Sequence, residues 1–198
     1  MTGYSDRINH AFAFAAKHHD REVRKGTRLP YLTHPANVAL ILTRYGQDED
    51  TVVAGILHDV VEDCRREGWT GEMLTERIAS KFGDAALAAA VAVTRRKYDD
   101  DGVELSRDDV RADCLARLAQ ADDAARWVFA ADKVHHAGSL LADLRRTFDP
   151  EAAWARLPGG RAGVLQWHRD ALARLREVGF AAPIVDELAA LVAALEER

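Results

Sequence analysis

The stretch Leu57-His58-Asp59-Val60-Val61-Glu62-Asp63-Cys64 decides how the rest of the chain is interpreted. At about 100° per residue, a helix here places His58, Asp59, Glu62 and Asp63 on one sector and leaves the other positions to aliphatic side chains. Titratable groups crowded on one side of an apolar helix repel one another and lose hydration unless a cation gathers them. An acidic face exposed to water is the alternative, but a histidine beside Asp59 within the apolar run favours a metal site.

The composition of the whole chain predicts one all-helical domain. Its 198 residues are 48% hydrophobic and 30% charged, which suffices for one substantial core. No run of alternating polar and apolar residues is long enough to predict a sheet. We therefore expect a single domain over 1–198, with a motif-bearing core at about 5–146 and closing helices at about 162–196.

Several classes of protein are disfavoured by the same sequence. The longest apolar run, 85–93, is too short and too rich in alanine to span a bilayer, and residues 1–4 do not begin a secretion signal. We expect a cytoplasmic protein with no membrane partner. Cys64 and Cys114 form neither a disulfide framework nor a zinc motif. A net charge of −5 argues against a general nucleic-acid partner.

Apolar spacing, capping residues and glycines predict where the helices begin and end. We expect helices at about 6–19, 33–46, 48–64, 70–82, 85–93, 106–118 and 124–146. A surface connection at 148–163 and two closing helices should follow. Two loops, 21–33 and 94–106, carry clusters of basic residues that either hold phosphates or are merely solvated.

Two residues outside the opening stretch are candidates to share its chemistry. His34 stands at a helix start, because Pro35 suits a first helical turn. Alone it would more often be a capping histidine, but a second His-Asp pair on the next helix strengthens the metal interpretation. Asp132 lies within an apolar stretch, where its burial requires a partner, either a lone salt bridge or a metal.

In order and spacing, His34, His58-Asp59 and Asp132 resemble the HD metal-dependent phosphohydrolases. Further segments resemble the alarmone hydrolases related to the RelA/SpoT hydrolase domain. These segments are Arg24-Lys25-Gly26-Thr27, Pro30-Tyr31, His34-Pro35, His58-Asp59-Val60-Val61-Glu62-Asp63, Phe82-Gly83, Val93-Thr94 and Ala131-Asp132-Lys133. The resemblance covers about 12–144. It is nearest to the stand-alone small alarmone hydrolases, including the metazoan form, because little sequence remains on either side for a further domain.

The resemblance implies a single all-helical HD phosphohydrolase domain that binds one Mn²⁺. The implied activity removes pyrophosphate from the 3′ position of ppGpp or pppGpp, giving GDP or GTP. It implies metal ligands His34, His58, Asp59 and Asp132, and a catalytic pair of Glu62 and Asp63. It also implies substrate contacts from Arg24, Lys25, Lys97, His136 and Ser139. Independently, a mixture of imidazoles and carboxylates suits a divalent ion that keeps positions for water and a phosphate oxygen.

The sequence also departs from that family. His136 replaces an asparagine, Gly138-Ser139-Leu140 replaces a segment with an arginine-leucine or similar pair, and Arg95-Arg96-Lys97 replaces a lysine-rich segment. These changes spare the metal ligands but leave the preferred base open. The alternatives are an HD hydrolase of another phosphorylated nucleotide, such as an adenine alarmone or NADPH, and a non-catalytic nucleotide-binding regulator. The oligomeric state is left open as well.

Overall fold

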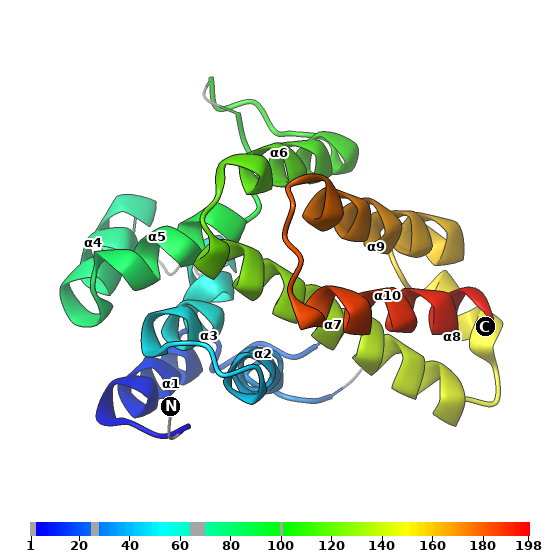
Figure 1. Ribbon diagram of the computed structural model, residues 1–198, viewed down its shortest axis with the longest axis horizontal. Coiled ribbons are helices and arrows are strands. Elements are labelled where there is room, and N and C mark those ends of the chain that lie inside the picture. The colour runs from blue at the N-terminus through cyan, green and yellow to red at the C-terminus, as the bar shows by residue number, and fades with distance from the viewer. Residues whose placement is uncertain (1–2, 25–27, 64–69, 100) are drawn as a thin grey trace. The chain divides into compact units, whose positions relative to one another are not determined.

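A computed structural model describes residues 3–24, 28–63, 70–99 and 101–198 as helices joined by loops (Figure 1). Across these residues the backbone forms no sheet; isolated bridges pair Val23 with Pro30 and Tyr98 with Glu104. The prediction of an all-α fold is therefore confirmed. None of the described helices is both long enough and apolar enough to cross a bilayer.

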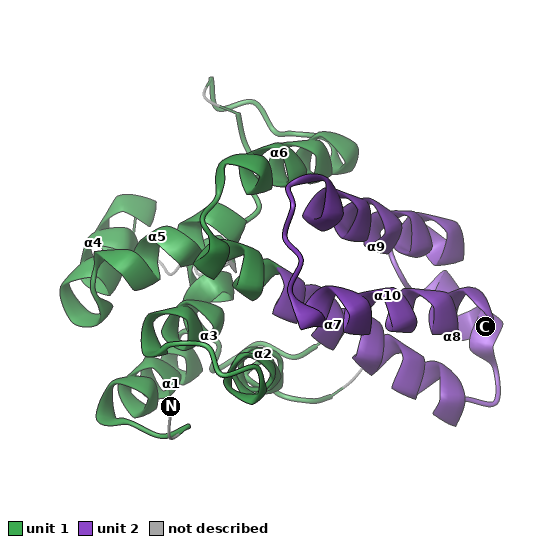
Figure 2. Cartoon of the chain, viewed as in Figure 1, with its two compact units in different colours: residues 1–129 green, residues 130–198 purple. Residues whose placement is uncertain are grey.

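The helices fall into two compact units, residues 1–129 and residues 130–198 (Figure 2). The bounds are α1 Asp6–His18, α2 Thr33–Arg44, α3 Glu49–Asp63, α4 Gly71–Phe82, α5 Asp84–Val93, α6 Arg107–Gln120, α7 Asp123–Arg146, α8 Pro150–Ala155, α9 Gly160–Glu177 and α10 Pro183–Glu196. Helix α7 begins in the first unit and continues without a break into the second.

Helix α3 is the centre of the first unit. It packs against α1, α2, α4 and α5, and every residue from 51 to 60 is buried. A helix that is apolar nearly all round belongs in a core. His58 and Asp59 interrupt this apolar surface at 4% exposure each. The core of the unit therefore forms around two polar side chains, which the surrounding structure must satisfy.

The predicted helix starts in this unit are confirmed by their capping bonds. Ser5, Thr70 and Ser106 each precede a helix and accept a hydrogen bond from a backbone N–H three residues later. The Ser106 hydroxyl also donates to Asp109 Oδ2 at 2.6 Å. Such side chains satisfy backbone N–H groups that have no partner within the helix.

A close approach of α2 to α3 depends on Gly55. A Cβ added there would lie 2.5 Å from Leu42 Cδ1 and 3.2 Å from Val38 Cγ1. Leu42 is fully buried, so its side chain has little room to move away. We predict that Gly55→Ala lowers the free energy of unfolding by about 1 to 3 kcal/mol, as overpacking of a core does.

Denaturant unfolding of Gly55→Ala beside Gly71→Ala checks this prediction. Gly71 is also helical, but an added Cβ would meet nothing within 4 Å. Alanine should therefore be neutral or stabilising at position 71. Equal stability of the two variants would mean that α2 and α3 separate at no cost.

In the second unit, the expected surface connection at 148–163 is partly wrong. It contains α8, and α9 begins within it at Gly160. The Asp149 side chain accepts from Ala152 N at 2.9 Å, and Pro150 occupies the first turn. Trp154 is 2% exposed and holds this short helix against the unit, in which α8 and α10 both pack on α9. The two closing helices are confirmed as α9 and α10.

Candidate metal centre

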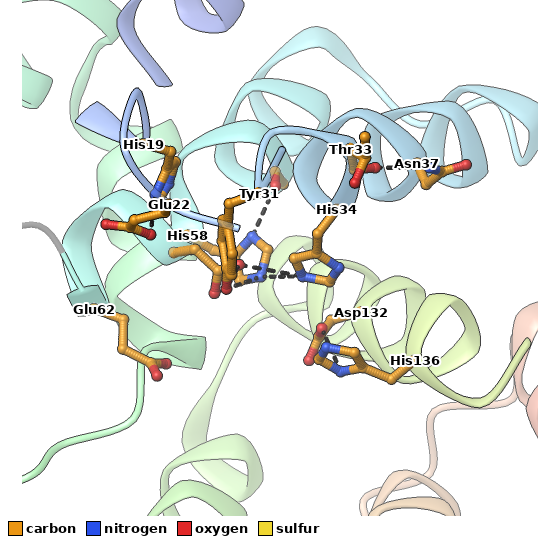
Figure 3. A network of polar contacts seen from close by, with 12 residues as sticks. His19, Glu22, Tyr31, Thr33, His34, Asn37, His58, Glu62, Asp132 and His136 are labelled. Atoms are coloured by element: carbon orange, nitrogen blue, oxygen red, sulfur yellow. Dashed lines mark hydrogen bonds and ion pairs between the residues drawn. The ribbon is translucent and has the colours of Figure 1, made fainter. Parts of the chain in front are cut away.

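Two imidazoles from different helices meet in the core of the first unit. His34 lies in the first turn of α2, where its backbone N–H donates to Tyr31 O at 2.8 Å, and His58 lies on α3. Their Nε2 atoms are 3.4 Å apart, and the two rings point toward one another in Figure 3. Asp59 joins them, with Oδ2 3.2 Å from His34 Nε2 and Oδ1 3.2 Å from His58 Nε2. The structure thus groups three of the four predicted ligands within one unit.

The hydrogen bond of His58 decides which of its ring nitrogens faces Asp59. Its Nδ1 lies 2.8 Å from the carbonyl oxygen of Gly55, which can only accept, so Nδ1 carries the hydrogen. In a neutral ring, Nε2 then presents a lone pair to the Asp59 carboxylate. Because His58 and Asp59 are each only 4% exposed, water cannot screen the repulsion between these two acceptors. A proton or a metal ion between them removes the repulsion, and the mixed nitrogen and oxygen donors fit a divalent metal.

Tyr31 orients the carboxylate of this group. Its hydroxyl donates to Asp59 Oδ2 at 2.8 Å, and its ring lies 4.8 Å from that of His19 and 6.0 Å from that of His34. Such an outer hydrogen bond fixes a ligating carboxylate in position. The sequence motifs include Tyr31, but they do not predict it as a site residue. Its signal is a tyrosine placed just before a helix that begins with a buried histidine.

Glu62 follows His58 by one helical turn and is held by Arg95. The Glu62 side chain is only 4% exposed, and its Oε2 accepts from Arg95 N at 3.1 Å and Arg95 Nε at 3.0 Å. A second guanidinium nitrogen of Arg95 contacts Oε1. This forked arrangement fixes the plane of the carboxylate. The sequence predicts Lys97 of this basic cluster as a substrate contact and does not predict a role for Arg95.

The neighbouring Arg96 turns to a different partner. It donates to Asp113 Oδ1 on α6 at 2.7 Å, and Arg117 donates to Oδ2 at 2.8 Å. Partial burial opposes ionisation of this aspartate, but the two arginines outweigh it and hold the pKa of Asp113 below its ordinary value. Arg95 and Arg96 thereby anchor the segment after α5 to α3 on one side and to α6 on the other.

In the second unit, the buried Asp132 has two basic neighbours. It is 8% exposed, Lys133 Nζ contacts its Oδ2, and His136 Nδ1 lies 3.0 Å from its Oδ1. Lys133 Nζ also lies 5.1 Å from the centre of the Trp167 ring. The expectation that Asp132 has a partner is confirmed. Its carboxylate is oriented by a lysine and by the histidine one turn later.

The remaining predicted site residues are distributed over both units. Lys25 and the side chain of Asp63 lie outside the described residues. The Arg24 backbone donates to Leu29 O at 3.0 Å, and its side chain is half-buried; Lys97 is exposed. His136 and Ser139 are half-buried on the part of α7 that belongs to the second unit. Substrate contacts from these residues stay predictions.

Comparison with known proteins identifies the family. Residues 11–165 match the model of the HD domain. Because the match covers most of the chain, the protein belongs to the HD-domain family.

Named relatives share part of this sequence. The chain is 31% identical over 141 residues to guanosine-3′,5′-bis(diphosphate) 3′-pyrophosphohydrolase of Aquifex aeolicus, covering 66% of this chain and 19% of that protein. It is 33% identical over 138 residues to the GTP pyrophosphokinase of Myxococcus xanthus, covering 68% of this chain and 17% of that protein. The chain therefore spans less than a fifth of the length of these two relatives.

Two solved structures share the fold. One is a metazoan ortholog of SpoT that hydrolyzes ppGpp, with a TM-score of 0.73 and 24% identity over 96% of each chain. The other comes from Listeria monocytogenes EGD-e, with a TM-score of 0.68 and 26% identity over 83% of this chain and 99% of that one. The predicted HD fold is confirmed by the family match and by these structures.

Proposed function

We propose that this protein is a cytoplasmic Mn²⁺-dependent hydrolase that removes the 3′-pyrophosphate of guanosine tetra- or pentaphosphate, giving GDP or GTP. The observation that carries the proposal is the buried cluster of His34, His58 and Asp59, which lies one helical turn before Glu62 on α3. Membership of the HD-domain family and the activity named for the relative from Aquifex aeolicus support the same reaction.

His34, His58, Asp59 and Asp132 would hold the metal. Asp132 is buried on α7, at 8% exposure. We propose that it supplies the fourth protein ligand, with Lys133 and His136 orienting its carboxylate. A bound divalent ion polarises a phosphate oxygen and lowers the pKa of a coordinated water by several units.

Glu62 would act as the general base, with Asp63 as the second member of the catalytic pair. The attacking water would form a bond from its oxygen to phosphorus while the bond from phosphorus to the ribose 3′ oxygen breaks. Glu62 would take up the proton of the water, and the departing 3′ oxygen would receive a proton from Glu62 or from solvent to become the 3′-hydroxyl. A base in this position contributes about 10² to 10⁴ in rate. Arg95 keeps the carboxylate in place for the transfer, since it binds both of its oxygens.

Arg24 and Lys25 would bind the diphosphate groups, the first as a planar fork and the second as a point charge. Lys97, His136 and Ser139 would complete the nucleotide contacts. His136 stands where the related hydrolases have an asparagine, and this difference supports a second candidate, hydrolysis of an adenine alarmone or NADPH, because an imidazole offers the base a different set of donors. A non-catalytic regulator would not need a carboxylate held as firmly as Glu62.

An assay with Mn²⁺ and a panel of nucleotides tests these candidates. We expect ppGpp and pppGpp to give pyrophosphate with GDP and GTP, identified by anion-exchange chromatography and ³¹P NMR. Faster turnover of the adenine alarmone, or release of orthophosphate from NADPH, would support the second candidate. Tight binding of ppGpp with no product from any nucleotide would identify a regulator.

Arg95→Ala should lower kcat about tenfold and change KM little, because Glu62 loses both guanidinium contacts and keeps only the backbone one. Because the Arg95 side chain is 48% exposed, its removal should change the melting temperature only slightly. Steady-state kinetics measure the effect, and Arg96→Ala is the matched control because Arg96 binds Asp113 instead. Equal kcat values for the two variants would show that Glu62 needs no support from Arg95.

A further inference from the structure

A cavity of about 340 Å³ lies between α1 and α4 in the first unit, on residues to which the proposed reaction gives no role. Its lining consists of basic, aromatic and small side chains: His10, Ala13, Phe14, Lys17, His18, Arg77 and Lys81. None of these is a proposed metal ligand or catalytic residue. Its volume falls at the lower end of the range for small-molecule sites.

The cavity is built from two helix faces. His10, Phe14 and His18 recur every four residues on α1, and Arg77 and Lys81 are likewise one turn apart on α4. Phe82 joins the two helices, with its ring 5.0 Å from that of His10 and 5.5 Å from that of Phe14. This packing fixes the spacing between the two rows of side chains.

Burial divides the lining into a base and a rim. Phe14 is 8% exposed and His18 is 9% exposed, and their rings lie 4.4 Å apart. Lys17, Arg77 and Lys81 are exposed around them. The site therefore has an aromatic base and a rim that carries full positive charges.

The rim of the cavity is positively charged, whereas the whole chain carries a net negative charge. The protein carries a net charge of −5, yet the lining of this cavity, as far as the described residues form it, includes no carboxylate. Arg77 and Lys81 are like charges one turn apart, an arrangement that destabilises a helix by a few tenths of a kcal/mol. The rim thus gathers positive charge from α1 and α4.

We propose that the cavity binds a small phosphorylated molecule. The Arg77 guanidinium can take two phosphate oxygens as a fork, Lys17 and Lys81 supply point charges, and His10 lines the same cavity. The base formed by Phe14 and His18 would receive the less polar part of the ligand. This inference is independent of the proposed hydrolase activity.

Titration of the full-length protein with inorganic pyrophosphate tests the proposal, with diamagnetic Mg²⁺ in place of Mn²⁺ so that the NMR signals stay sharp, and with the heat of mixing pyrophosphate and Mg²⁺ subtracted. Calorimetry in low salt gives the affinity, and NMR signals of the His10 and His18 rings report binding at the cavity itself. We expect both ring signals to move in the wild type. Arg77→Ala and Lys81→Ala should each weaken this binding about tenfold, the scale of one lost charge-assisted contact. Lys81→Arg should retain it.

Two controls make the outcome decisive. Arg107→Ala removes an exposed positive charge from the start of α6 and should change the affinity less than twofold. His58→Ala damages the proposed metal site and should leave the movement of the His10 and His18 signals intact. The proposal is overturned if these signals stay fixed, or if Arg77→Ala and Lys81→Ala bind pyrophosphate as the wild type does. Binding lost in His58→Ala alone would place the pyrophosphate at the metal.

Discussion

Glu62→Gln should lower kcat by roughly a hundredfold or more and leave Mn²⁺ affinity unchanged. Glutamine has the shape of glutamate and keeps one oxygen for the bonds from Arg95, but it cannot take up a proton from water. Because the Glu62 side chain is 4% exposed and fixed, no other group can readily replace it. Steady-state hydrolysis of ppGpp gives kcat, and calorimetric titration with Mn²⁺ gives the metal affinity.

Glu72→Gln is the matched control for this prediction. Glu72 lies exposed in the first turn of α4, and its substitution should leave kcat within twofold of the wild type. A Glu62→Gln enzyme with full turnover would assign proton transfer to another residue. Loss of Mn²⁺ affinity together with turnover would make Glu62 a metal ligand instead.

His58→Ala should abolish detectable hydrolysis and weaken Mn²⁺ binding by a factor of a hundred or more. The His58 imidazole is the central proposed metal ligand of the cluster, since its Nε2 lies 3.4 Å from His34 Nε2 and 3.2 Å from Asp59 Oδ1. A metal at 100 times its Kd stabilises a protein by about 2.7 kcal/mol. For a chain of this size that corresponds to a rise in Tm of about 5 to 10 °C, which the variant should lack.

Thermal unfolding with and without Mn²⁺ measures this loss separately from activity. His168→Ala is a close control, because His168 is also 4% exposed and its Nδ1 lies 2.9 Å from the backbone oxygen of Val164. Both substitutions create a cavity and remove a side-chain hydrogen bond to a helix carbonyl, but only His58→Ala should remove the response to Mn²⁺. An equal rise in Tm for wild type and His58→Ala would rule out His58 as a ligand.

Much of this site could be predicted because its signal is local. A polar sector on an otherwise apolar helix is visible within the eight residues 57–64, and Pro35 marks the turn that carries His34. Helix starts such as Ser106 are local too, since the capping bond spans three residues. The short helix α8 was missed because its anchor, Trp154, becomes apolar core only through packing against the rest of its unit.

The contacts that were missed depend on packing between distant segments. Tyr31 reaches Asp59 across 28 positions, and Arg95 reaches Glu62 across 33. Three adjacent cations, Arg95, Arg96 and Lys97, look equivalent in the sequence, and only the path of the chain after α5 decides which one meets α3. Gly55 looks like an unfavourable residue within a helix until Leu42 is seen above it.

Arg95 holds Glu62 partly through its backbone N–H, so this part of the hold does not depend on the side chain at position 95. Any residue with a backbone N–H can keep the 3.1 Å bond to Oε2, and proline alone cannot. Other substitutions would therefore remove only the side-chain contacts with Glu62, whereas a change to proline would remove the backbone hydrogen bond as well. Substitutions at position 95 can therefore be tolerated in steps during evolution. Substitution of His58 cannot, because its contacts with His34 and Asp59 come from its side-chain Nε2.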